Sequence, residues 1–172
     1  MTHILILYDG RTPQINALAH ALEEGIARVA GSKALLRPVE AASREDLLAA
    51  HAIILGSPNW TGITATLKEW LDQQGDLWEQ GALAGKVGAA FTSGRGRHSG
   101  LEFTLLSLIH WMLACGMIVV GLPWSEKMRL SGSYYGATAA GPLTEEDLDQ
   151  ARVLGKRVAT VASALRELRK DT

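Results

Sequence analysis

The sequence alternates between two kinds of apolar pattern, and this alternation constrains the fold more than any other feature. Short, uninterrupted apolar runs are typical of buried strands, whereas apolar residues spaced three and four apart are typical of amphipathic helices. A strand-like run is followed by a helix-like segment five times, with short connections. Parallel strands need crossover helices and bury both of their faces. The pattern therefore predicts an α/β fold, a doubly wound parallel sheet with helices on both faces.

The predicted elements cover most of the chain. The expected strands lie at residues 3–8, 34–39, 52–55, 86–91 and 117–120. The expected helices lie at residues 13–30, 63–71, about 99–114 and 144–168, with a short helix that begins after Ser43. Ser43 and Thr144 each precede an aspartate by three residues, which is typical of a helix N-terminus. The stretch from Pro123 to Leu143, rich in Gly, Ser and Tyr, is expected to be a long irregular loop.

One segment, Phe103–Ser125, contains no Asp, Glu, Lys or Arg and is long enough to suggest a membrane helix. Gly116 and Pro123 interrupt it, so a helix followed by a buried strand explains the segment better than a membrane span. The chain starts directly with the apolar run at residues 4–7, without the basic region of a signal peptide. With 47% hydrophobic residues in 172, we expect a single cytoplasmic domain over residues 1–172.

Charge and cysteine content exclude several classes of protein. Lys and Arg (17) nearly balance Asp and Glu (18), whereas nucleic-acid-binding domains usually carry a basic surface. The one cysteine, Cys115, excludes an internal disulfide and any metal site built from several cysteines. The five histidines have no metal-binding spacing, so we expect no metal. The sequence has no Walker A motif and no Gly-x-Ser-x-Gly motif.

Three loops that follow expected strands are candidate parts of one binding site, because ligands of doubly wound sheets bind beyond the carboxyl ends of the strands. In the first loop Thr12 is a candidate N-cap and Pro13 suits the first helical position. Free N–H groups there suit a phosphate, although an ordinary capped turn fits the same residues. In the second loop Trp60 either stacks on a planar ligand or packs against the protein. The third loop, residues 92–100, is rich in glycine and contains two arginines.

Short motifs along nearly the whole chain resemble the flavodoxin-like NAD(P)H:quinone oxidoreductases of the WrbA type. The set between residues 71 and 86, together with Tyr135-Gly136-Ala137-Thr138, is the part most specific to that family. The motifs are Gly56-Ser57-Pro58 with Gly62, Leu71-Asp72-Gln73, Gly75-Asp76-Leu77-Trp78, Gly81-Ala82-Leu83, Gly85-Lys86, Phe91-Thr92-Ser93 and Gly116-Met117-Ile118-Val119. The resemblance implies a flavodoxin-like doubly wound sheet of five parallel strands in the order 2-1-3-4-5.

The resemblance also implies non-covalently bound FMN, NAD(P)H as co-substrate and a small quinone-like acceptor. The chemistry then centres on the flavin, and no catalytic acid or base stands out. Trp60 and Trp78 are implied to shape the substrate slot, and Arg11, Arg95 and Arg97 are candidates to neutralise the phosphates of the dinucleotide. The residues implied to bind FMN are Gly10, Arg11, Thr12, Pro13, Gln14, Ile15, Ser57, Pro58, Asn59, Trp60, Thr61, Gly62, Ser93, Gly94, Arg95, Gly96 and Arg97.

The chain departs from the family pattern at three places. Gly10 and Pro13 stand where the family's phosphate loop usually has a serine or threonine and a glycine. Ala114 or Cys115 stands where family members place a histidine over the flavin. An insertion that helps the family to form tetramers is absent between residues 38 and 47. The chain is therefore expected to be a shortened member of the family. Separately, we expect it to form a homo-oligomer, either a dimer or a tetramer.

Two other functions are compatible with the same sequence. One is a flavodoxin-like electron carrier without substrate turnover of its own. The net charge of -1 disfavours it, because carriers that dock on basic partners are usually acidic. The other is a protein of this fold that has lost the flavin and acts through protein contacts.

Overall fold

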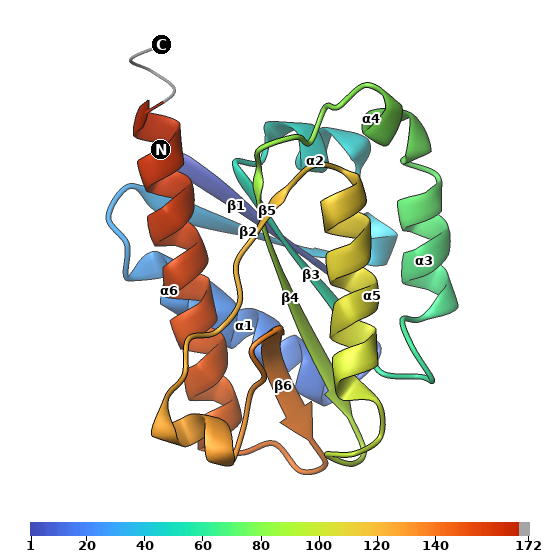
Figure 1. Cartoon of the computed structure of the whole chain (residues 1–172), viewed down its shortest axis with the longest axis vertical. Helices are drawn as coiled ribbons and strands as arrows, with labels where there is room; N and C mark the ends of the chain where they lie inside the picture. The colour runs from blue at the N-terminus through green and yellow to red at the C-terminus, as the bar shows by residue number, and fades with distance from the viewer. Residues whose placement is uncertain (169–172) are drawn as a thin grey trace.

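A parallel β-sheet lies at the centre of the computed structural model, which describes residues 1–168 (Figure 1). Its strands are β1 (Thr2–Tyr8), β2 (Ser32–Pro38), β3 (Ala52–Pro58), β4 (Val87–Gly94), β5 (Ile118–Val119) and β6 (Gly136–Ala140). The order along the sheet is β2-β1-β3-β4-β5, and all of these pairs are parallel. The central strands β1, β3 and β4 are apolar and almost completely buried, as parallel strands covered on both faces must be. The predicted fold class is confirmed.

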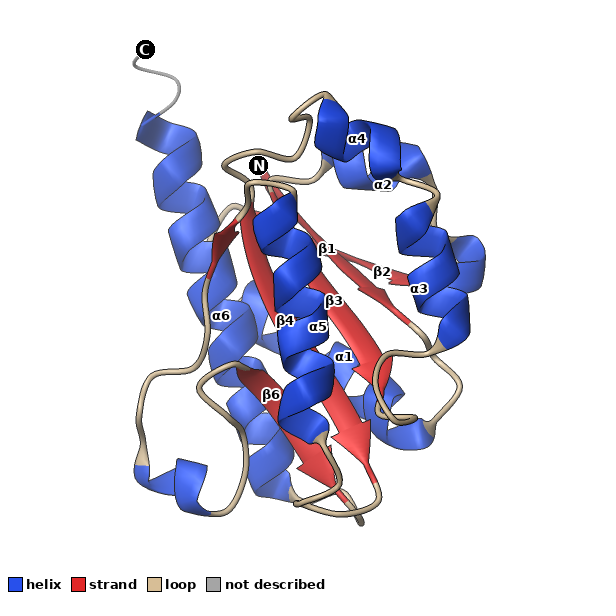
Figure 2. Cartoon of the chain, turned by 45° about the vertical axis from the view of Figure 1, so that its right-hand side comes forward, coloured by secondary structure: helices blue, strands red, loops and turns tan. Residues whose placement is uncertain are grey.

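Helices cover both faces of the sheet (Figure 2). They are α1 (Pro13–Ala27), α2 (Arg44–Ala49), α3 (Ala65–Asp72), α4 (Gly75–Glu79), α5 (Leu101–Ala114) and α6 (Glu145–Leu168), with short 3₁₀ helices η1 (Val39–Ala41) and η2 (Glu126–Arg129). The apolar sides of α1 and α6 pack in one core with alternate residues of β1, β3 and β4. Those of α2, α3, α4 and α5 form a second core on the opposite face.

The sixth strand corrects one prediction. The stretch from Pro123 to Leu143 is not irregular throughout, because it contains β6, which pairs with the carboxyl-terminal half of β4. The two-residue β5 pairs with the start of β4, so β5 and β6 occupy the same edge of β4 one after the other. The small residues of β6 hide the strand pattern but are required by the packing. A Cβ atom on Gly136 would lie 1.9 Å from the carbonyl oxygen of Ala90.

The helix boundaries follow local hydrogen bonds. The first helix ends at Ala27, earlier than residue 30, because Arg28 is its C-cap. Both expected acid-containing N-termini are present: the Ser43 hydroxyl accepts from the N–H of Asp46, and the Asp46 carboxylate accepts from the N–H of Ser43. Thr144 and Asp147 make the same reciprocal pair. The helix expected at residues 63–71 is α3, and α4 is an additional short helix after it.

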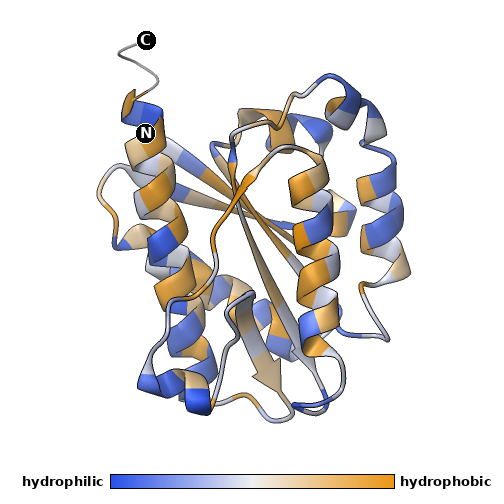
Figure 3. Cartoon of the chain, in the orientation of Figure 1, coloured by the Kyte–Doolittle hydropathy of each residue, from blue (hydrophilic) through white to orange (hydrophobic). Residues whose placement is uncertain are grey.

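The segment without charged residues forms α5 and β5, as predicted. Much of α5 is apolar, as its colour in Figure 3 shows, and it packs Leu105, Leu108 and Met112 into the core beside β4. Within residues 1–168, no helix combines the length and the apolar character that crossing a membrane requires.

Candidate functional site

The loops that follow β1, β3, β4 and β6 meet at the carboxyl end of the sheet and line a cavity of about 1000 Å³. This size is at the upper end of small-ligand pockets, about 300–1,000 Å³. Its position agrees with the general rule for ligands of doubly wound sheets. The described residues that line it are Thr12, Pro13, Gln14, Pro58, Asn59, Trp60, Thr61, Ser93, Gly94, Arg95, Ser99 and Gly141.

The loop after β1 presents unpaired donors to the cavity. Thr12 is the N-cap of α1, and its hydroxyl accepts from the N–H of Ile15 at 3.4 Å. Pro13 occupies the first helical position and has no N–H. Within residues 1–168, no hydrogen bond occupies the N–H groups of Thr12 and Gln14. These donors, together with the positive end of the α1 dipole, suit an anion.

The loop after β3 is held by the side chain of Asn59. Its Nδ2 donates to the carbonyl of Ser99 at 2.7 Å, and its Oδ1 accepts from the N–H of Gly62 and the hydroxyl of Thr104. Thr61 has a left-handed backbone with φ of 61°, which turns the chain sharply after Trp60. The Trp60 ring lines the cavity and is 60% exposed. An exposed aromatic ring at this edge suits a planar ligand.

The loop after β4 completes the cavity with hydroxyl groups and one cation. The Ser93 hydroxyl lies 3.4 Å from that of Thr12, so the loops after β1 and β4 touch. Arg95 is exposed and has no ion pair or hydrogen bond within the described part of the chain. None of the described residues that line the cavity is acidic. The lining is therefore compatible with a ligand that joins an anionic group to a planar ring.

Comparison with known protein families identifies the family of the chain. Residues 27–126 match the family model described as NADPH-dependent FMN reductase. This match covers more than half of the 172 residues. The chain belongs to that family.

Curated relatives of this FMN reductase family member match over nearly its whole length. The NAD(P)H dehydrogenase (quinone) of Archaeoglobus fulgidus is 38% identical over 96% of this chain and 100% of the relative. The protein of the same name from Gluconacetobacter diazotrophicus is also 38% identical, over 96% and 99% of the two chains. The first alignment spans 191 residues, so the relative has insertions that this chain of 172 residues lacks.

Solved structures show the same fold. The flavodoxin, WrbA-like protein from Agrobacterium tumefaciens superposes with a TM-score of 0.76 at 23% identity, covering 95% of this chain and 99% of the other. Oxidised flavodoxin 1 from Bacillus cereus has a TM-score of 0.70 at 16% identity, covering 92% and 98%. The resemblance seen in the sequence is confirmed, and the fold is flavodoxin-like.

In this FMN reductase family member, two of the arginines expected at the ligand point elsewhere. Arg11 pairs with Asp9 and does not belong to the described lining of the cavity. The Arg97 guanidinium donates to the carbonyls of Arg129 and Leu130 at 3.1 and 2.8 Å. Arg95 is therefore the only one of the three expected arginines whose side chain lines the cavity.

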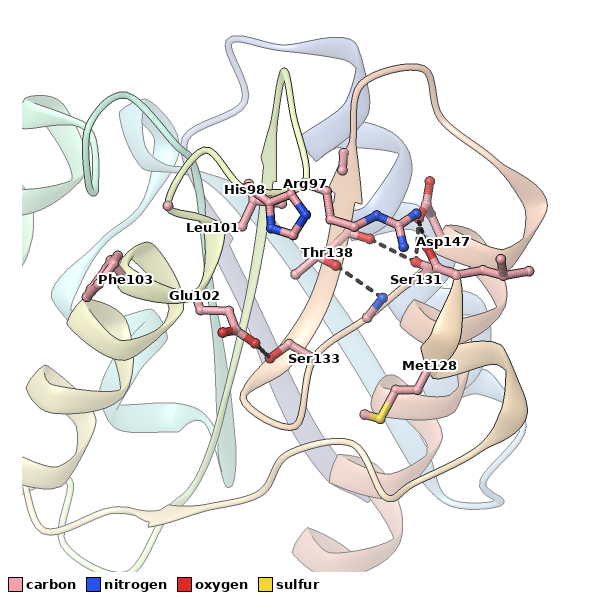
Figure 4. Close-up of a pocket in the computed structure, with 14 residues that line it drawn as sticks. Arg97, His98, Leu101, Glu102, Phe103, Met128, Ser131, Ser133, Thr138 and Asp147 are labelled. Carbon is pink, nitrogen blue, oxygen red and sulfur yellow. Dashed lines mark hydrogen bonds between the residues drawn. The ribbon is translucent and has the colours of Figure 1, made fainter.

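A second, smaller cavity of about 360 Å³ lies beside Arg97, between the β4–α5 loop, β6 and the start of α6 (Figure 4). Apart from His98, its polar side chains are paired within the described part of the chain. The Ser133 hydroxyl donates to Glu102 at 2.7 Å, and the Ser131 hydroxyl donates to Asp147. These bonds hold the segment between β5 and β6 against the starts of α5 and α6, and Arg97 holds it against the loop after β4.

The remaining expected residues do not belong to the described lining of the main cavity. Ile15 is buried in the core, and the buried Ser57 hydroxyl donates to the carbonyl of Pro58 and accepts from the N–H of Thr64. Trp78 lies on α4, at the opposite end of the strands from the cavity (Figure 1). A role for Trp78 at a ligand of this cavity therefore requires a second copy of the chain. The other expected residues outside the described lining are Gly10, Gly62 and Gly96.

Ser99 and Gly141 line the cavity but are not among the expected ligand residues. Ser99 lies near the end of the glycine-rich loop at residues 92–100, so the expected loop includes it although the expected ligand residues end at Arg97. Gly141 follows β6, and its N–H donates to the carbonyl of Gly94 at 2.8 Å. The small residues of β6 carry no strand pattern, so no local sequence signal marks Gly141 as a cavity residue.

The chemistry of the site does not come from a cysteine. Burial raises the pKa of the Cys115 thiol, which disfavours the reactive thiolate. Cys115 packs as a small apolar residue at the end of α5. Among residues 1–168, no group of three or more His, Cys, Asp and Glu side chains is arranged to hold a metal ion.

Proposed function

We propose that the main cavity binds FMN and that this chain is an FMN-dependent oxidoreductase that takes a hydride from NAD(P)H and reduces quinone-like acceptors. The observation that carries the proposal is the combination, in one cavity, of unpaired N–H groups at the start of α1 and an exposed Trp60 ring. Membership of the NADPH-dependent FMN reductase family supports the same cofactor and reductant. The curated relatives named NAD(P)H dehydrogenase (quinone) support the acceptor.

In this proposal the chain binds and orients the cofactor. The N–H groups of Thr12 and Gln14 and the Thr12 hydroxyl hold the phosphate, and the dipole of α1 supplies the compensating charge. The Trp60 ring packs against the isoalloxazine, and the backbone of residues 93–95 faces its pyrimidine end. When bound, FMN supplies the hydride and electron transfer chemistry. Arg95, the unpaired cation in the lining, attracts the phosphates of the dinucleotide.

The experiment that tests this function starts from protein freed of flavin. We expect FMN fluorescence to be quenched at micromolar protein, NADH or NADPH to bleach the bound flavin, and benzoquinone to restore its absorbance rapidly. Absence of quenching would remove every flavin-based function. A bound flavin that neither nucleotide reduces would indicate an electron carrier.

Replacement of Trp60 by Ala is expected to weaken FMN binding about tenfold, the upper end of what an aromatic stacking pair contributes, about 0.5–1.5 kcal/mol. The dissociation constant from flavin fluorescence measures this change. Trp124→Ala is the matched control, because Trp124 has similar exposure, 56%, and lies outside both cavities. Equal affinities of the two variants would contradict a stacking role for Trp60.

We also propose that the chain forms a homo-oligomer in the cytoplasm and that residues 1–172 act as a single domain. The outer side of α5 exposes Phe103, Leu106 and Leu113, with exposed fractions of 76%, 38% and 57%. A helix that is apolar around most of its circumference is normally buried. A second copy packed on this side of α5 would cover these side chains.

A further inference from the structure

We propose that Arg11 is a positioning residue of the flavin site: held by the buried carboxylate of Asp9, its guanidinium supports the Trp60 ring. The support of the Trp60 ring by Arg11 does not depend on the proposed function. The contact between that ring and the flavin does. The sequence pattern suggested a different role for Arg11, contact with a phosphate. The contacts of its side chain favour the support of Trp60.

Asp9 is the anchor of this arrangement. It follows β1 directly and is completely buried, with an exposed fraction of 0%. Its Oδ1 accepts from the N–H of Arg11 at 3.2 Å and from Arg11 Nε at 2.8 Å. Its Oδ2 accepts from the Thr64 hydroxyl at 2.7 Å. A buried carboxylate needs this full set of partners, and they tie the loop after β1 to the N-cap of α3.

The guanidinium of Arg11 reaches from this anchor to the start of α3 and to the loop after β3. Its terminal Nη2 donates to the Thr66 hydroxyl at 2.6 Å, and its Cζ lies 5.4 Å from the centroid of the Trp60 ring. A guanidinium within about 6 Å of an indole centroid makes a cation–π contact. The two bonds to Asp9 and the bond to Thr66 therefore hold the guanidinium against the Trp60 ring, which is otherwise exposed.

The same contacts leave Arg11 poorly placed for a phosphate. Nε and Nη2 are both engaged, and Arg11 does not belong to the described lining of the cavity, whereas Trp60 does. The Trp60 ring is 60% exposed, and among the ring contacts of the described residues it takes part only in the one with Arg11. The Asp9–Arg11 pair supplies support for the ring from the neighbouring loop.

The first arm of the test uses flavin-free protein labelled with ¹⁵N. Each of the five tryptophans gives an indole N–H signal, and a Trp60→Phe variant identifies that of Trp60. In Arg11→Met we expect the Trp60 signal to shift and its heteronuclear NOE to fall, with a smaller change in Arg11→Lys. Arg44→Met is the matched control, because Arg44 makes a two-bond ion pair with Asp76 away from the cavity. An unchanged Trp60 signal in Arg11→Met would overturn the proposal.

The second arm compares the binding of FMN with that of riboflavin, which has no phosphate. Arg11→Met should weaken both ligands by the same factor, about threefold, as expected for loss of an exposed cation–π contact. A loss confined to FMN would mean that Arg11 binds the phosphate and would overturn the proposal. Circular dichroism and the thermal midpoint check that the variants are folded. If the wild type binds neither ligand, the proposed function fails, and the indole signals still decide whether Arg11 supports Trp60.

Discussion

Replacement of Thr12 by Asp is expected to weaken FMN binding about 100-fold while leaving the stability of the protein unchanged. Asp is at least as good an N-cap as Thr, so α1 keeps its start. Its carboxylate, however, stands where the phosphate is proposed to bind. Two like charges about 4 Å apart near a protein surface repel each other by about 4 kcal/mol, part of which is relieved when the side chain turns away. Fluorescence titration measures the affinity.

Two comparisons test whether the loss of affinity in Thr12→Asp is due to the phosphate of FMN. Thr12→Ser keeps both the cap and the hydroxyl donor, and its FMN affinity should stay within about twofold of the wild type, because Ser and Thr are similar N-caps. Riboflavin should bind Thr12→Asp as well as it binds the wild type. If FMN and riboflavin lose affinity equally, the phosphate does not lie at Thr12. This pattern is the opposite of the one expected for Arg11→Met.

Replacement of Gly25 by Ala is expected to lower the free energy of unfolding by about 3 kcal/mol, the upper end of the usual cost of overpacking a core. Gly25 lies where α1 crosses α6, and a Cβ atom there would lie 2.1 Å from the carbonyl oxygen of Arg152. Backbone cannot move aside as a flexible side chain can, so the two helices must separate. Urea unfolding measures the loss as a lower midpoint with an unchanged slope.

Gly75→Ala is the matched control for Gly25→Ala. Gly75 is also helical, but a Cβ atom added there would meet nothing within 4 Å. Its stability should be equal to or slightly above that of the wild type, because Ala is a better helix former than Gly. Equal midpoints for Gly25→Ala and Gly75→Ala would show that the α1–α6 contact adjusts without cost.

Much of the fold could be read from local patterns, and the misses have a common physical cause. Strands β1, β3 and β4 are buried on both faces and therefore carry continuous apolar runs, which are easy to recognise. Strand β6 consists of small residues because it lies close against the backbone of β4 at Gly136. A requirement for small size leaves no apolar periodicity, so the sequence suggested a loop.

The candidate site also has a part that could be predicted from local sequence and a part that could not. Thr12 and Trp60 could be chosen from the sequence, because an N-cap and a loop aromatic after a strand are local features. The bond from Arg11 to Thr66 and the bonds from Arg97 to Arg129 and Leu130 could not, because these partners are remote in sequence. Long, flexible arginine side chains find their partners only after the loops have been brought together.

The sequence alone determined the alternation of strands and helices, the edge of the sheet where the ligand loops lie and the resemblance to a flavin-dependent family. These properties depend on periodicity, caps and short motifs, which act over a few residues. The tertiary structure alone decided which arginine faces the cavity, that β6 shares the edge of β4 with β5, and that Trp78 lies far from Trp60. Each of these depends on distances between loops that are far apart along the chain, and only the packed sheet sets those distances.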